Sequence, residues 1–266
     1  HADPRWLDVV ARAFRAPGAF ALARDPSGAV CAGVAGYYSR TLRGARVFHS
    51  LRHGVLTREP AALGPLMAAV EADCRSRGCT QAVLGGAPEL LPGPYRASVH
   101  TTLTLDLAGG PTSLWDGFSN KVRNIIRRAE RGGLEVSRDL AHLSTFHTIY
   151  ARAMTERRAN VRALPFFRAI FDVFGADARL YSAVAAGRSC GAMVVVSADG
   201  FAAYPFGAFD ELGRRRGANT LLLWQVARDL VHLRRLVHRA ADEEDALHRG
   251  HVPSSHRVLK VPAANA

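Results

Sequence analysis

The chain has 266 residues, of which 48% are hydrophobic, and its mean hydropathy is close to zero, so the composition excludes an extended disordered protein. This length allows one large domain or two of roughly 130 residues. No apolar run reaches the ~20 residues that a membrane-spanning helix needs. The formal net charge is +12, but lysine occurs only at positions 121 and 260, and we attribute half of the arginine excess to codon preference. The charge therefore indicates an anionic partner only where it is concentrated.

The cysteines and histidines give no metal-binding pattern. None of the four cysteines forms a C-x-x-C pair, so we predict that Cys31, Cys74, Cys79 and Cys190 are free thiols. Free thiols are typical of a reducing compartment, and we therefore predict a cytoplasmic location for the protein. Five of the eleven histidines lie in the last 35 residues, with spacings that fit no zinc site. We predict no bound metal.

The first part of the chain predicts a mixed sheet with helices. Apolar segments flank the turn at 25–28, which is typical of a hairpin, and the helix predicted over 59–77 starts beside Pro60 and ends at Gly78. The other elements expected here are a helix over 5–15 and strands over 46–54, 80–87 and 99–107. We assign residues 1–110 to a first lobe.

The second part repeats the same order of elements. A long helix is expected from Ser113 to Arg131, with Gly132 and Gly133 as its stop, in a connecting segment 111–132. The elements expected after it are a strand over 134–139, helices over 141–158 and 165–174, strands over 179–187, 190–200 and 201–209, and a helix over 217–233. We assign 133–233 to a second lobe that carries the catalytic site, and 234–266 to an irregular C-terminal tail.

Cations are concentrated on the helix predicted over 113–131. Helical spacing places Trp115, Phe118 and Val122 on an apolar stripe. The remaining faces carry one amide and five cations within eleven residues: Lys121, Arg123, Asn124, Arg127, Arg128 and Arg131. Such a face is typical of a site that binds phosphate groups. It is equally typical of the solvent-exposed side of a helix between two lobes.

The order of residues through this helix resembles the FemAB family, the FemA/FemX-like transferases of the GNAT superfamily. Asp-Leu at 106–107 and Leu-Trp at 114–115 precede Ser-x-Lys-x-Arg-Asn-x-Ile-Arg-x-Ala-x-x-x-Gly over 119–133. The matching positions are Lys121, Arg123, Asn124, Ile126, Arg127, Ala129 and Gly133. The resemblance implies an α/β (α+β) fold of two tandem GNAT-like lobes, with mixed sheets flanked by helices and joined by a basic helix. It extends over about 5–233 and then fails.

One further segment approximates the R/Q-x-x-G-x-G/A loop of GNAT enzymes. Arg214, Arg216, Gly217 and Asn219 lie between a strand and a helix, where Gly217 lets the backbone approach a ligand and the helix N-terminus presents N–H groups to an anion. A coenzyme A pyrophosphate or an RNA phosphate would fit there. The alternative is an ordinary helix start that Asn219 caps.

Two single residues complete the candidate site. Tyr204 lies on the aromatic strand that, by the resemblance, lines the acceptor cleft, where it would donate a hydrogen bond or act as an acid; packing in the core explains it equally well. Arg157, at a helix end, would order a substrate phosphate or would simply be solvated.

The resemblance implies an acyl or aminoacyl transferase. The donor would be acyl-CoA or aminoacyl-tRNA, with no tightly bound cofactor, and the acceptor a small-molecule or lipid-linked amine of a peptidoglycan, cell-wall or polysaccharide precursor. The expected location is the cytoplasm, with peripheral contact at the inner face of the membrane. The alternative is a catalytically degenerate FemAB-like protein that binds RNA or another anionic ligand.

Overall fold

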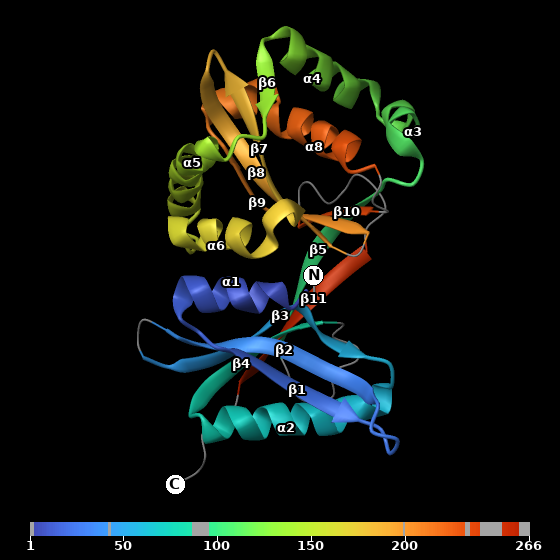
Figure 1. Ribbon diagram of the computed structural model, residues 1–266, viewed down its shortest axis with the longest axis vertical. Coiled ribbons are helices and arrows are strands. Elements are labelled where there is room, and N and C mark those ends of the chain that lie inside the picture. Colours follow the sequence, from blue (N-terminus) through green and yellow to red (C-terminus); the bar gives the residue numbers. More distant parts are fainter. Residues whose placement is uncertain are drawn as a thin grey trace. The chain divides into compact units, whose positions relative to one another are not determined.

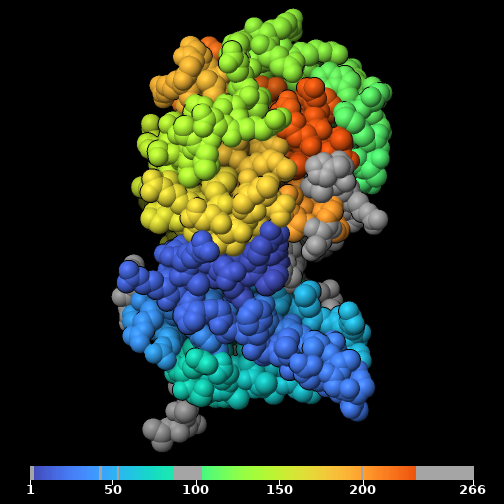
Figure 2. All heavy atoms as spheres, in the orientation of Figure 1, coloured from blue at the N-terminus to red at the C-terminus, as the bar shows by residue number. Residues whose placement is uncertain are grey.

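The computed structural model describes residues 3–41, 44–86, 96–198, 200–231, 235–239 and 252–260; for residues 53, 96–103, 235–239 and 252–260 it describes the backbone only. The chain divides into two compact units, which Figures 1 and 2 colour along the sequence: residues 1–102 with 242–266 form the first, and residues 103–241 the second. No helix of the described residues is long and apolar enough to cross a bilayer.

The first unit is a mixed sheet with one helix on each face. Its strand order is β1-β2-β3-β4-β11-β5, with β3 and β4 parallel and the other neighbours antiparallel. The strands are β1 (Gly18–Arg24), β2 (Val30–Arg40), β3 (Arg46–Thr57), β4 (Cys79–Gly86), β11 (Val252–Lys260) and β5 (Arg96–Asp106), and the helices are α1 (Arg5–Phe14) and α2 (Leu63–Ser76). The main core lies under α2, where Leu63, Leu66 and Val70 pack against the alternate residues of β1 and β2.

The second unit is a five-stranded sheet covered by helices on both faces. Its strand order is β10-β9-β8-β7-β6; β10 runs parallel to β9 and the other pairs are antiparallel. The strands are β6 (Leu134–Ser137), β7 (Ala178–Ala185), β8 (Arg188–Ala198), β9 (Phe201–Phe209) and β10 (Arg235–Arg239). The helices are α3 (Gly110–Gly117), α4 (Asn120–Arg131), α5 (Leu143–Glu156), α6 (Leu164–Phe174), α7 (Glu211–Arg216) and α8 (Ala218–Asp229).

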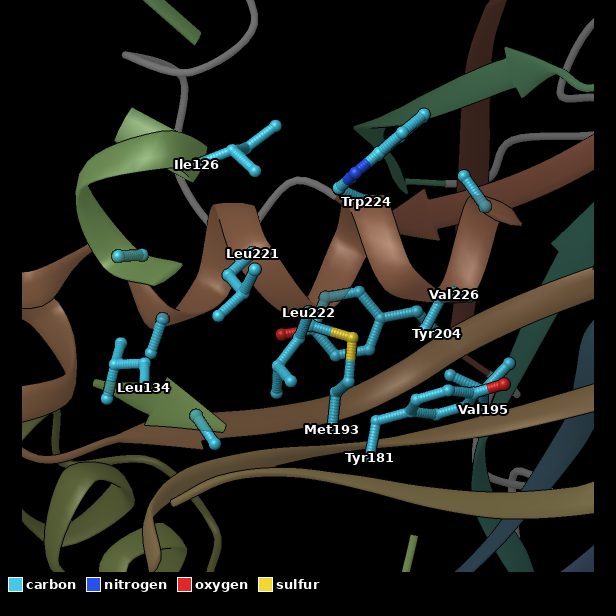
Figure 3. Packing of buried hydrophobic residues seen from close by; sticks show 14 of the residues in the cluster. Ile126, Leu134, Tyr181, Met193, Val195, Tyr204, Leu221, Leu222, Trp224 and Val226 are labelled. Carbon is cyan, nitrogen blue, oxygen red and sulfur yellow. The ribbon is translucent and has the colours of Figure 1, made fainter. Parts of the chain in front are cut away.

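The core of the second unit lies between its sheet and α8 (Figure 3). Leu222 of α8 packs over Met193 of β8 and Tyr204 of β9, while Ile126 of α4 approaches α8 from the other side. On the opposite face, aromatic rings of α5 and α6 surround Phe206, with ring centroids 5.3 Å apart between Phe206 and Phe167.

The predicted elements of the second unit are confirmed in kind, except that the expected long helix is two helices. Phe118 and Ser119 are extended, with ψ of 141° and 154°, and separate α3 from α4. The Ser119 hydroxyl accepts a hydrogen bond from the N–H of Val122 at 3.4 Å, which makes it the N-cap of α4. Both helices belong to the second unit, so the segment assigned to 111–132 is part of that unit.

The segment expected to be an irregular tail contains two strands. Residues 235–238 of β10 pair with 201–204 of β9, and β11 lies between β4 and β5. These residues lack a strong apolar pattern, and the neighbouring strands supply the hydrogen-bonding partners that make them extended. The acidic run 242–245 and the histidines at 232, 248 and 251 lie outside the described residues. All four cysteines are buried free thiols, as predicted.

Replacing the cap of α4 tests the separation of the two helices. We expect Ser119→Ala to lower the free energy of unfolding by about 1 kcal/mol, because it leaves an N–H at the start of α4 without its acceptor. Urea denaturation monitored by circular dichroism measures this change. Thr112→Ala, an exposed substitution within α3, is the control, and an equal loss in both variants would contradict the capping role.

Candidate functional site

A β-bulge interrupts the pairing of β9 with β8. Val194 pairs with Phe206 and Val196 pairs with Ala203, so Val195 alone faces Tyr204 and Pro205. A bulge of this kind bends the strand and redirects the backbone groups beside it. Pro205 has no N–H, which suits it to a position where the ladder is already interrupted.

The outer edge of β9 is open beyond the bulge. The register of β10 with β9 covers only 201–204, so among the described residues Phe206, Gly207 and Ala208 pair with β8 but not with β10. Strands that separate in this way leave backbone N–H and C=O groups facing a gap. Among the described residues, this short stretch of β9 therefore has no strand partner on the side away from β8.

Tyr204 is a buried residue directly before this open edge. Its side chain is 6% exposed and packs in the core under α8 (Figure 3). Its hydroxyl lies 1.9 Å from where a Cβ of Gly207 would be, so the phenol covers the glycine backbone. Burial raises the pKa of Tyr204, and the charge of Arg157 opposes this rise only in part. At neutral pH the phenol is protonated, and it can donate a hydrogen bond but cannot accept a proton as a base.

Of the two alternatives for Tyr204, the structure accounts for the packing in the core, and the role toward an acceptor stays a prediction. The ring belongs to the core, as the packing interpretation predicts, while the hydroxyl lies beside the open part of β9. Arg157, at the C-terminal end of α5, is exposed, and its charge reaches the phenol. The positive charge of Arg157 thus acts to lower the pKa of Tyr204.

The segment predicted as a phosphate-binding loop is helical up to Gly217. Arg214 and Arg216 belong to α7, and Gly217 has φ of 77° between α7 and α8. A Cβ at Gly217 would lie 2.5 Å from Cγ2 of Ile125, so close packing against α4 also requires glycine there. Asn219 lies exposed in the first turn of α8 and does not cap it, because Gly217 is the N-cap and no side chain caps this helix.

The three cationic residues of α4 that the sequence predicts to bind a ligand differ in their contacts and their exposure to solvent. Arg123 donates to the carbonyl oxygens of Trp115 and Asp116, both at 3.3 Å, and so holds the end of α3. Lys121 is exposed, and the exposed Arg127 has its guanidinium carbon 5.3 Å from the Trp115 ring. Asn124 is exposed on the same helix. Arg123 therefore has a structural role, whereas Lys121, Asn124 and Arg127 face solvent.

The basic helix and the Gly217 turn are neighbours within the second unit. Arg216 donates to the carbonyl oxygen of Gly132, which follows α4, at 3.0 Å. The side chain of Ile125 lies against Gly217. No ion pair between described residues involves a side chain of α4. The exposed face of α4 therefore carries uncompensated positive charge beside the start of α8.

Sequence reasoning missed a hollow at the end of β9. The hollow has a volume of about 380 Å³ and is enclosed by α5 and by the turn from β9 to α7. Arg152, Arg188 and Arg214 line it, with Glu156 and Asp210 as partners of the first two at 2.9 and 3.3 Å. Asp210 caps α7 by accepting from the N–H of Gly213. The sequence Asp-x-x-Gly after a strand could have indicated the cap, but no local signal brings Arg152 to it.

Gly217 provides a test of the packing of α8 against α4. We expect Gly217→Ala to destabilise the protein by about 1–2 kcal/mol from the left-handed backbone alone, and by more because the new methyl group meets Ile125. The double variant Gly217→Ala, Ile125→Ala should lose less than the sum of the two single losses, since the second change removes the clash. Thermal denaturation of all four proteins measures this coupling; strictly additive losses would show that the two residues are not in contact.

Tyr204 makes a prediction about alkaline pH. The unfolded chain releases the tyrosine proton near the ordinary pKa of about 10, whereas the folded protein retains it, so raising the pH above about 10 favours unfolding. We expect Tyr204→Phe to lose less stability than the wild type between neutral pH and about pH 11. Urea titrations across this range measure the two slopes, and identical slopes would contradict the raised pKa.

Comparison with known proteins identifies the fold. Residues 117–245 match the family model described as an acetyltransferase (GNAT) domain. No curated protein sequence matches the chain. The structure is similar to that of FemX, with 11% identity, a TM-score of 0.67, and coverage of 95% of this chain and 90% of FemX.

Two further solved structures share the fold of nearly the whole chain. One is a tandem GNAT protein from the clavulanic acid biosynthesis pathway, with 16% identity, a TM-score of 0.60, and coverage of 98% of this chain and 95% of that one. The other is the C-terminal domain of a putative lysylphosphatidylglycerol synthetase from Agrobacterium fabrum, with 13% identity, a TM-score of 0.57, and coverage of 90% and 83%. Residues 117–245 therefore match a GNAT acetyltransferase domain, and the chain as a whole has the two-unit fold that FemX and the tandem GNAT protein share.

Proposed function

We propose that the chain transfers an acyl or aminoacyl group from acyl-CoA or aminoacyl-tRNA to an amine of a cell-envelope or polysaccharide precursor. The family match and the fold shared with FemX and a lysylphosphatidylglycerol synthetase domain support an acyl-type donor and an amine acceptor. The observation that carries the proposal is the open edge of β9 beyond its bulge.

The open edge would bind the carbonyl of the donor. When the amine nitrogen attacks this carbonyl, negative charge develops on the oxygen, and fixed backbone N–H groups stabilise it without reorganising. Neighbouring residues of an antiparallel strand direct their N–H groups to opposite sides, so at least one of residues 206–208 would present its N–H on the side away from β8. The reaction then needs mainly alignment of amine and carbonyl, and no protein nucleophile.

Tyr204 would act on the leaving group. Its hydroxyl is protonated at neutral pH, as that of an ordinary tyrosine would be, and burial raises its pKa further. It would donate a hydrogen bond to the thiolate of CoA or the ribose oxygen of a tRNA as the bond to the acyl carbon breaks. The attacking amine must be deprotonated by another group, since a protonated phenol cannot do so.

Cations at the α4 and α7 ends would hold the phosphates of the donor. Lys121, Arg127, Arg128 and Arg131 are exposed on α4, and the hollow with Arg152, Arg188 and Arg214 lies at the end of β9. The first turn of α8, with Asn219, adds N–H groups that have no partner within the helix. Both donors present phosphates, so this charge supports either.

A degenerate binding protein is the weaker alternative. Its main support in the sequence was the lack of a strand after position 233, and β10 pairs with β9 there. The exposed cations of α4 would serve RNA binding as well as donor binding. Turnover distinguishes the two functions, because a binding protein would retain RNA without transferring an acyl group.

The transfer reaction can be tested by mass spectrometry of acceptor mixtures incubated with the protein and either acyl-CoA or charged tRNA. We expect saturable acylation of an amine with one donor class. Retention of RNA with a steep salt dependence, and no acylated product with either donor, would reject the enzyme in favour of the binding protein.

The basic face of α4 makes its own prediction. We expect Arg127→Ala with Arg128→Ala to weaken donor binding about tenfold at low salt, because two phosphate contacts are lost, with a smaller effect at high salt. Arg12→Ala with Arg40→Ala removes the same charge from exposed positions of the first unit and is the control. Equal donor affinity of the two double variants would remove α4 from the donor site.

A further inference from the structure

The first unit carries an apolar furrow on the face of its sheet opposite α2. Leu22 of β1 and Leu56 of β3 both pair with Gly33 of β2, so two large side chains flank a residue that has none. Phe20 of β1 pairs with Ala35 of β2, so a large side chain again lies beside a small one. The result is a groove along β2 with a small-residue floor and apolar walls.

The walls of the furrow are exposed to an unusual degree. Phe20 is 63%, Leu22 54% and Leu56 56% exposed, and the hollow that they enclose has a volume of about 370 Å³. Burying apolar surface is favourable by about 25 cal/mol per Å², so large apolar side chains gathered around one hollow indicate a binding surface.

Helices cover the neighbouring parts of β1 and β2, which makes the furrow distinct from them. The alternate residues of β1 and β2, such as Ala21 and Val34, pack under α2. On the furrow's own face, α1 covers the start of β1, where Leu7 lies 3.2 Å from the Cβ position of Gly18. The furrow begins beyond that contact and continues toward the hairpin at 25–28.

A single cation stands at the hairpin end of the furrow. Among the described residues that line the hollow, Arg58 is the only charged one, and it follows Leu56 by two positions. Its backbone N–H donates to the carbonyl oxygen of Cys31 at 2.8 Å, which fixes the chain there, and its side chain is in no ion pair with another described residue. Thr57 also lines this end.

We propose that this furrow binds the alkyl chain of an anionic amphiphile, with the headgroup at Arg58. From Cys31 to Ala35 the floor is about 13 Å long at 3.3 Å per residue, and it is one strand wide, which suits an extended chain better than a ring. A stable dimer buries about 800 Å² on each partner, more than a groove of three walls supplies. This proposal is independent of the transferase function.

Filling the floor of the furrow tests the proposal directly. Gly33 has no positive φ, and a Cβ there would lie 2.9 Å from Cδ2 of Leu22, the end of a flexible side chain, and 3.5 Å from the carbonyl oxygen of Ala21. Gly33→Val therefore occupies the groove at a position that a strand tolerates. The measurement is isothermal titration of the full chain with dodecyl phosphate below its micellar concentration. We expect at least tenfold weaker binding than the wild type, with Gly64→Ala, on the exposed side of α2, unchanged.

The headgroup is tested with a second variant and a second probe. Arg58→Gln should weaken binding of dodecyl phosphate severalfold but leave binding of dodecyl maltoside, which has the same chain and a neutral head, unaltered. Arg40→Gln, an exposed arginine at the far end of β2, is the matched control.

Three results would overturn the proposal. The first is wild-type affinity for dodecyl phosphate in Gly33→Val, or no binding by the wild type. The second is a concentration-dependent dimer that Gly33→Val abolishes without any binding of the amphiphile, which would make the furrow an interface between copies. The third is binding to vesicles of anionic phospholipid without binding of the free amphiphile, which would make it a membrane contact.

Discussion

The second unit is organised around a helix that is buried on both sides. The buried residues of α8 include Leu222, which packs on the sheet, and Ala218, which is fully buried at its start. A helix with apolar residues on two sides is stable only when another element covers the side that faces away from the sheet. In this unit α4 is that cover, and its apolar side chain Ile126 is 0% exposed. The same packing directs the charged side chains of α4 outward, so the basic face follows from the core.

Helix α8 also restrains the C-terminal end of strand β9. Gly217 joins α7 to α8 and packs against α4, while α7 follows β9 through Asp210, whose N–H donates to the carbonyl oxygen of Cys190 at 3.0 Å. The open edge of β9 therefore lies between a bulge at Pro205 and an anchored turn at Asp210. A reaction that relies on fixed backbone donors needs such rigidity, because donors that must reorient lose much of their effect.

The sequence predicted the regular parts of this fold and missed those that depend on distant partners. The apolar runs and glycine turns between residues 179 and 209 gave three strands in the right places. The break at Ser119 was missed because Phe118 and Val122 keep helical spacing across it, and a periodic pattern does not register a cap. Strand β10 was missed because its partner β9 supplies the hydrogen bonds. The contact of Arg123 with the end of α3 was missed because the carbonyl groups that accept its hydrogen bonds become free only where α3 ends.

The position of β11 has a consequence for the order in which the protein acquires its structure during synthesis. β11 lies between β4 and β5, yet it is translated after the entire second unit. Until then β4 and β5 have no strand between them, and each presents an unpaired edge of the kind that associates with other chains. The usual succession, in which the N-terminal domain matures first on the ribosome, is therefore reversed here. The ribosome has synthesised the whole second unit before it synthesises β11, the last strand of the first unit.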